Sequence, residues 1–143
     1  MASLTGATTV YQLAIENLFP APQQLQGFAA DDVFDTPSIQ SAQVLMGVDG
    51  FMSAGFQFVE IKQSISIQAD SDSNDIFDQW WEVQQQQQDV FFANAVVLLT
   101  ALGKKWTMTR GVLTGYSPIP DVKKLIQPRK FEITWNSMSP AAV

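Results

Sequence analysis

The chain has 143 residues, a length that fits one domain, because a single hydrophobic core usually organises about 100 to 200 residues. Apolar residues make up 46% of the sequence and charged residues 15%, which is enough core-forming material to exclude a disordered protein. The sequence contains no Cys and no His. Disulfides, zinc–thiolate sites, cysteine nucleophiles and histidine proton shuttles are therefore excluded, and with them most enzyme mechanisms.

The formal net charge of −6 disfavours tight binding to nucleic acid or to anionic membranes. The charges are unevenly distributed: residues 1–103 hold 12 acids and one base, whereas residues 104–143 hold seven bases and two acids. This asymmetry fits either solvated strand faces or two oppositely charged surfaces that meet in copies of the molecule. No apolar run approaches the roughly 20 residues that span a bilayer, and the N-terminus has no signal-peptide pattern, so we expect no membrane insertion and folding in a cytoplasm.

The first predicted element is a strand over residues 9–18. Tyr11, Leu13 and Ile15 recur at every second position, the spacing of a strand with one buried face. The next segment, from Pro20 to Pro37, contains prolines, a glycine and the acids Asp31, Asp32 and Asp35, which favours a long extended loop. Because loops above about 12 to 15 residues in compact domains usually bind something, this segment is predicted to be a contact arm.

The Asp49-Gly50 pair predicts a β-hairpin between residues 38–48 and 51–68, because glycine readily adopts the positive φ of a tight turn. The end of the second arm is predicted to be a strand with one buried face, formed by Val59, Ile61, Ile65 and Ile67. The beginning of that arm carries more apolar surface than a solvated hairpin normally shows, from Phe51, Met52, Phe56 and Phe58.

A helix is predicted over about residues 74–88. The segment from Asp70 to Asp75 supplies capping side chains, and Asp75 and Asp78 fall in the first turn, where the helix dipole favours acids. The apolar residues that follow form a stripe suited to packing on a sheet, and consist of Ile76, Phe77, Trp80 and Trp81. The run from Gln84 to Gln88 continues the helix as its solvent face or a contact surface.

The pattern then returns to strands, over residues 96–100, 106–116 and 129–135, with a turn at residues 103–105. Gly111 predicts a bulge in the middle strand. The expected buried positions of these strands are Trp106, Met108, Val112, Tyr116, Phe131, Ile133 and Trp135. About six strands and one helix make the chain mainly β.

The acids near the helix start need no chemical role. Asp70, Asp72, Asp75 and Asp78 are explained by capping, and the partial likeness of this segment to a calcium loop lacks the sixth-position glycine and the closing glutamate. A phosphate-binding loop pattern is also missing. We therefore expect no enzyme activity, no metal and no cofactor.

The basic residues of the C-terminal part allow two interpretations. They are either solvated strand edges that lysine protects from aggregation, or a face that meets the acidic part of an identical neighbour. They are Lys104, Lys105, Arg110, Lys123, Lys124, Arg129 and Lys130.

The order of these elements resembles the tail tube proteins of bacteriophages, particularly contractile-tailed ones, and is similar in plan to type VI secretion tube proteins. The resemblance covers about residues 35–137, through "QSISIQADSDSNDIFDQWW", "KKWTMTRGVLTGYSPIPDVKK" and "RKFEITW". It implies a β-sandwich or barrel-like pair of antiparallel sheets with one flanking helix. It also implies a single tail-tube-like domain over residues 1–143, in which about residues 20–58, the arm and hairpin, contact other subunits.

The function that the resemblance implies is structural: hexameric rings stack into a hollow virion tail tube with an acidic lumen that conducts DNA without binding it. The expected partners are the chain itself, the tail sheath, the baseplate and the tail terminator, with assembly in the host cytoplasm. The predicted subunit-interface residues are Phe51, Phe56, Phe58, Lys123, Lys124 and Arg129. One alternative is a tube-initiating or terminating ring, or a secretion-system tube subunit. Another is a small β-sandwich module that binds a carbohydrate or peptide by stacking on Trp80, Trp81, Trp106 or Trp135.

Overall fold

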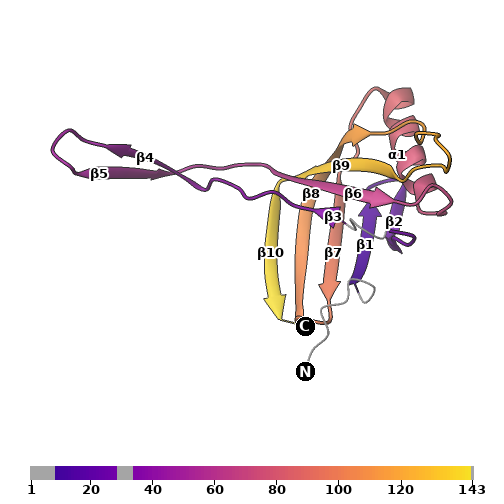
Figure 1. Cartoon of the computed structure of the whole chain (residues 1–143), viewed down its shortest axis with the longest axis horizontal. Coiled ribbons are helices and arrows are strands. Elements are labelled where there is room, and N and C mark those ends of the chain that lie inside the picture. The colour runs from indigo at the N-terminus through magenta and orange to yellow at the C-terminus, as the bar shows by residue number, and fades with distance from the viewer. Residues whose placement is uncertain (1–8, 29–33, 143) are drawn as a thin grey trace.

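The computed structural model describes residues 9–28 and 34–142 and confirms a mainly β chain with antiparallel sheets and one helix among these residues (Figure 1). The helix α1 spans Asn74–Gln87. The strands are β1 Thr9–Ile15, β2 Phe19–Gln24, β3 Phe34–Asp35, β4 Ala42–Met46, β5 Met52–Phe56, β6 Ile61–Ile67, β7 Ala93–Leu99, β8 Lys104–Tyr116, β9 Arg129–Trp135 and β10 Ser137–Ala142.

The body is a β-sandwich made from one continuous sheet that passes from layer to layer through β8. Neighbouring strands follow the order β2-β1-β7-β8-β9-β6-β3, and β10 pairs with the first half of β8. The first half of β8 also pairs with β7, whereas its second half pairs with β9. Figure 1 shows β1, β7, β8 and β10 side by side in one layer, with β9 and β6 crossing them in the other. Sheets that cross in this way share strands that bend at a corner.

A bulge in the middle of β8 makes the bend. Arg110 has a φ of 50°, and one extra residue on β8 separates the partners of β7 at this point. The predicted bulge at Gly111 is confirmed, but it reverses which residues face the core: Met108 is buried before it and Leu113 after it. The prediction that Val112 continues the face of Met108 is therefore wrong.

The core between the layers contains a polar cluster whose hydrogen bonds are internal. Gln63 is 1% exposed, and its Oε1 accepts hydrogen bonds from the Tyr11 hydroxyl at 2.6 Å and from the Trp135 indole nitrogen at 3.3 Å. The Gln63 Nε2 donates to Thr36 Oγ1 at 3.2 Å. Burial raises the pKa of Tyr11, so this phenol stays neutral and keeps its donor. The apolar residues around the cluster include the predicted Leu13, Ile15, Ile61, Ile65, Ile67, Phe131, Ile133 and Trp135.

Helix α1 begins and ends as predicted, and its apolar stripe closes one end of the core. Phe77 and Trp80 are fully buried, and the Phe77 ring stacks on Phe131 with 4.2 Å between centroids. The predicted cap is wrong in detail: Ser73 is the N-cap residue, but its side chain makes no capping hydrogen bond. That side chain instead accepts from the backbone N–H of Gln26.

The prediction of an extended N-terminal arm from Pro20 to Pro37 is wrong at its start. The segment predicted as a loop from Pro20 begins with strand β2, which pairs with β1 and belongs to the body. The predicted acids Asp31 and Asp32 lie outside the described residues. The predicted strand over residues 51–68 is also two strands, β5 and β6, and Val59 between them is 37% exposed rather than buried.

Candidate assembly interface

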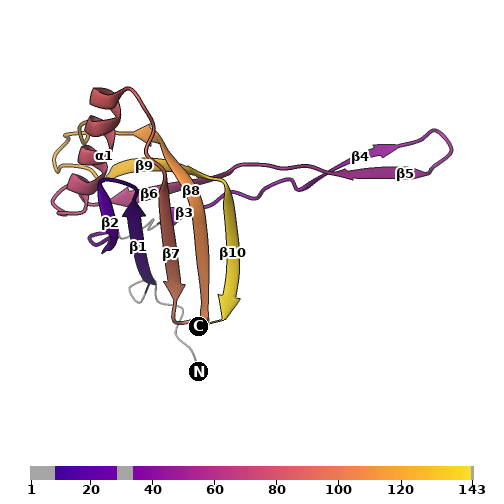
Figure 2. The ribbon, with the colours of Figure 1, turned by 180° about the vertical axis from the view of Figure 1, so that it is seen from behind.

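The β4–β5 hairpin projects far beyond the body (Figures 1 and 2). In the described part of the chain these two strands pair only with each other, and all their residues are exposed. The predicted turn closes the hairpin: Gly50 has a φ of 85°, the Gly47 N–H donates to the Phe51 carbonyl at 2.8 Å, and the Phe51 N–H donates to Asp49 Oδ1 at 3.1 Å. A two-stranded hairpin alone in water is marginally stable, so we expect the β4–β5 hairpin to pack against a partner surface.

The register of the hairpin places its apolar residues on one face. Directly opposed residues of an antiparallel pair share a face, and alternate pairs point to opposite sides. One face carries Ala42, Val44, Met46, Met52, Ala54 and Phe56, all of them apolar. The other face carries Gln43, Leu45, Ser53 and Gly55. The hairpin is therefore amphipathic, and its apolar face is uncovered within the described chain.

The three predicted phenylalanines lie on this projecting segment. Phe51 at the turn and Phe56 on the apolar face are each 73% exposed, and Phe58 at the base is 93% exposed. The rings of Phe56 and Phe58 meet edge to face with 4.9 Å between centroids. The structure thus brings Phe56 and Phe58 together and leaves Phe51 at the opposite end of the hairpin.

The predicted lysines Lys123 and Lys124 lie on a tight turn within the segment that joins β8 to β9, which we call the 117–128 loop. A bridge between Val122 and Ile126 and a hydrogen bond from the Lys123 N–H to the Leu125 carbonyl hold this turn. Exposed apolar side chains surround the lysines, namely Ile119, Val122, Leu125 and Ile126. A groove of about 770 Å³ runs between this loop and residues 68–70 at the end of β6.

Arg129, the remaining predicted interface residue, is engaged inside the chain. Arg129 is 7% exposed and forms a bidentate ion pair with Asp78. Its Nη2 donates to Asp78 Oδ1 at 2.7 Å, and its Nη1 donates to Asp78 Oδ2 at 3.2 Å. It also donates to the Ser117 carbonyl, and the Tyr116 hydroxyl donates to the same Asp78 carboxylate. These contacts tie α1 to both ends of the 117–128 loop. Asp78 is the fifth residue of α1, so the prediction that it lies in the first turn is wrong, and no local sequence pattern indicated its pairing with Arg129.

The ion pair shifts the pKa of each partner. Burial opposes ionisation of Asp78, but the hydrogen bonds from Arg129 and Tyr116 and the guanidinium charge outweigh it, so the pKa of Asp78 lies below its usual value. The hydrogen bond to Asp78 raises the pKa of Arg129. Both groups therefore stay charged at neutral pH.

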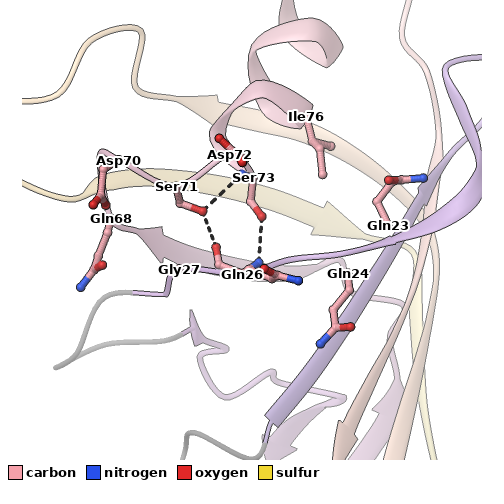
Figure 3. Close-up of a pocket in the computed structure, with 10 residues that line it drawn as sticks. All are labelled: Gln23, Gln24, Gln26, Gly27, Gln68, Asp70, Ser71, Asp72, Ser73 and Ile76. Atoms are coloured by element: carbon pink, nitrogen blue, oxygen red, sulfur yellow. Dashed lines mark hydrogen bonds between the residues drawn. The ribbon is translucent and has the colours of Figure 1, made fainter.

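A polar cleft lies beside the start of α1. Figure 3 shows that its serines point toward the Gln26 backbone. Ser71 Oγ donates to the Gln26 carbonyl at 2.6 Å, and the Gln26 N–H donates to Ser73 Oγ at 2.8 Å. In residues 9–28 and 34–142, no group of three acids could hold a metal ion. These contacts tie the chain after β2 to the helix start.

The tryptophans proposed for ligand stacking are mostly used in packing. Trp80 and Trp135 are fully buried, and the Trp81 ring stacks on Tyr116 with 4.9 Å between centroids. No helix in the part of the chain that the structure describes is long and apolar enough to cross a membrane.

Comparison with known proteins bears on both the family and the fold. The model of the tail fiber protein gp32 family matches residues 2–139. A search of curated protein sequences gave no match.

Solved structures with a similar fold come from contractile injection systems. A chain in the anti-feeding prophage baseplate has 14% identity and a TM-score of 0.62 and is aligned over 100% of this chain and 99% of its own length. A chain in the tube-terminating cap of the same particle has 10% identity and a TM-score of 0.70, with coverage of 100% and 93%. A chain in the sheath-tube complex of the extracellular injection system PVC has 12% identity and a TM-score of 0.65, with coverage of 93% and 88%. At these identities the likeness concerns the fold, whereas the family match identifies the chain: it belongs to the tail fiber protein gp32 family and is a structural protein of the phage-tail type.

Proposed function

We propose that this chain is the repeating subunit of a phage tail tube, in which hexameric rings stack into a hollow conduit for DNA. The observation that carries the proposal is the projecting hairpin, whose apolar face is exposed along its whole length. Soluble proteins rarely keep such a face uncovered unless it meets a partner. The shared fold with a chain of a sheath-tube complex supports a tube role, and the work of the protein would be geometric rather than catalytic.

A second candidate is a ring at an end of the tube. Two of the similar chains come from a baseplate and from a tube-terminating cap, so this fold also serves at tube ends. The two roles differ in copy number: a tube subunit is present many times per particle, whereas an end ring is present once. Quantitative mass spectrometry of purified particles distinguishes them.

We further propose that the chain forms one tail-tube-like domain with one segment for subunit contacts. The proposed contact segment changes from about residues 20–58 to about residues 37–60, because β2 belongs to the body. Sheath, baseplate and terminator proteins would be the other partners in the virion, after assembly in the host cytoplasm. The net charge of −6 suits a conduit that DNA crosses without specific binding.

The test is self-assembly of the purified protein, followed by negative-stain electron microscopy and sedimentation across a concentration series. Met46 and Leu45 are neighbours on β4 with 67% and 73% exposure but lie on opposite faces of the hairpin. We expect rings or tubes from the wild type, their loss in Met46→Ser, and their retention in the matched control Leu45→Ser. A wild type that stays monomeric at high concentration and is missing from phage tails would refute the proposal. It would favour the ligand-binding alternative, which ligand-induced changes in tryptophan fluorescence would then test.

A further inference from the structure

Two exposed apolar surfaces of the chain lie at opposite ends of the molecule. Figure 1 shows the β4–β5 hairpin at one end and the 117–128 loop, in orange and gold beside α1, at the other. The view from behind in Figure 2 shows the same separation. Neither surface reaches the other within one copy.

The two surfaces are matched in apolar character. The hairpin turn carries Val48 and Phe51, which are 110% and 73% exposed. The 117–128 loop exposes Leu125 and Ile126, at 77% and 60%, and both side chains line the groove of about 770 Å³. Exposed apolar side chains therefore occur both on the protruding turn and along the groove, which polar residues such as Gln68, Asp70 and Lys124 also line.

The two surfaces are opposite in charge. Residues 37–60 contain the acids Asp49 and Glu60 and no base, and Asp49 lies at the tip of the hairpin. The loop carries Lys123 and Lys124 against one acid, Asp121. Opposite charges on two such surfaces favour one orientation of contact and disfavour pairing of each surface with itself.

We propose that the hairpin tip of one copy docks in the groove beside the 117–128 loop of a second copy, with Asp49 facing Lys123 and Lys124. This inference rests on the proposed function, because it names the surface that receives the hairpin. The contact joins two different surfaces of identical chains, so each bound pair retains one free hairpin and one free groove. Such head-to-tail contacts continue until they close a ring or extend a stack.

The internal contacts of Arg129 support the loop that would receive the hairpin tip. Arg129 bonds to Asp78 on α1 and to the Ser117 carbonyl, so both ends of the 117–128 loop are fixed to α1. The position of the loop lysines is therefore restrained. Asp70 lies on the opposite wall of the groove, so the wall that carries Lys124 is the one that receives the acidic tip.

The natural chain has no Cys, so introduced thiols give a direct test of proximity. Val48→Cys on one tagged copy and Leu125→Cys on a second copy are mixed under assembly conditions and oxidised. A disulfide needs Cα atoms within about 7 Å, and the proposal predicts a mixed disulfide dimer several-fold more abundant than in a matched control. The control pairs Val48→Cys with Gln86→Cys, an exposed position on α1.

Charge reversal provides a second, independent measurement. Lys123→Glu with Lys124→Glu, and separately Asp49→Lys, should each weaken assembly, and a chain carrying all three changes should regain it. Circular dichroism of each variant establishes that the body is folded. Assemblies on the microscope grid with no excess of the mixed disulfide over the control, or with no rescue by the combined reversal of Asp49, Lys123 and Lys124, would overturn the docking and leave the proposed function standing. The failure of every variant and of the wild type to assemble would overturn both.

Discussion

Gly111 lies where β8 passes between the two layers, and replacing it with alanine tests whether that crossing is rigid. An added Cβ would stand 2.4 Å from both Cε3 and Cζ3 of Trp135, whereas carbon atoms pack best at about 3.5–4.0 Å. The indole cannot easily retreat, because it is fully buried and its nitrogen donates to Gln63. Either the ring or the strand must move, and both are held by the core.

We expect Gly111→Ala to lower the free energy of unfolding by about 1–3 kcal/mol, the usual cost of overpacking a core. For a chain of this size that corresponds to a fall in Tm on the order of 5 °C. Urea unfolding followed by tryptophan fluorescence measures the change at a concentration where the protein is monomeric. The control is Gly55→Ala, where no described atom lies within 4 Å of the added Cβ, and it should change stability by less than about 0.5 kcal/mol. Equal stability of Gly111→Ala and the wild type would refute a rigid crossing at Trp135.

Three further predictions concern the core, the ion pair and the hairpin. Tyr11→Phe removes one of the two hydrogen bonds to Gln63 Oε1 and should cost about 1 kcal/mol in urea unfolding; no change would mean that the buried amide does not depend on it. Asp78→Asn should cost roughly 1–2 kcal/mol at neutral pH, a value reduced for its partial exposure. Since the folded state lowers the pKa of Asp78, its contribution is present above the unfolded pKa and lost as pH falls through the folded pKa. Thermal melts from roughly pH 7 to pH 2 should therefore converge for wild type and Asp78→Asn in acid, and a constant gap would contradict the assignment. Gly50→Ala strains a turn at a φ of 85° and should weaken assembly while leaving the Tm of the body unchanged; a lower Tm would show that the hairpin is coupled to the core.

Regular alternation in the sequence predicted strands where no bulge interrupts them. In β1, β6 and β9 the core-facing positions keep a period of two, so Leu13, Ile65 and Ile133 lie in the core as expected, although one core-facing position of β6 is the polar Gln63. In β8 the same reasoning held as far as Met108 and then failed, because the bulge at Arg110 adds one residue. Gly111 marked the site of the bulge, but a sequence pattern alone does not show how many residues it inserts.

Strands β2 and β10 were missed because edge strands need little sequence signal. Both lie at an edge of their layer and pair on one side, β2 with β1 and β10 with β8. Their sequences, FPAPQQ and SMSPAA, contain prolines that normally indicate loops. Proline is tolerated at sheet edges and also discourages pairing with another chain. The features that hid these strands from sequence analysis are thus the features that suit an edge.

The candidate interface also contains residues whose environment the sequence indicated and one, Arg129, whose environment it did not. The exposure of the hairpin phenylalanines was predictable, because too many apolar residues follow Asp49-Gly50 for a solvated turn, whereas their role in subunit contacts stays a prediction. Arg129 was not, because its partner Asp78 is 51 residues away and already had a local explanation at the helix start. Local charge counting placed Arg129 with the exposed lysines, and only the tertiary fold shows that it is used internally.

The relative strengths of the forces at the proposed interface determine how assembly should respond to salt. Burying one large apolar side chain contributes about 1.5–3 kcal/mol, whereas an exposed ion pair contributes about 0–1 kcal/mol and is screened by salt. The apolar face of the hairpin holds Val44, Met46, Met52 and Phe56, so apolar burial exceeds the contribution of Asp49 with two lysines. Wild-type assemblies should therefore persist at high ionic strength, while the charge-reversed lysine variant, which brings like charges together, should recover assembly as salt is added. Light scattering measures the assemblies as salt is added. If salt alone dissolves the wild-type assemblies, charge rather than the apolar face dominates the contact.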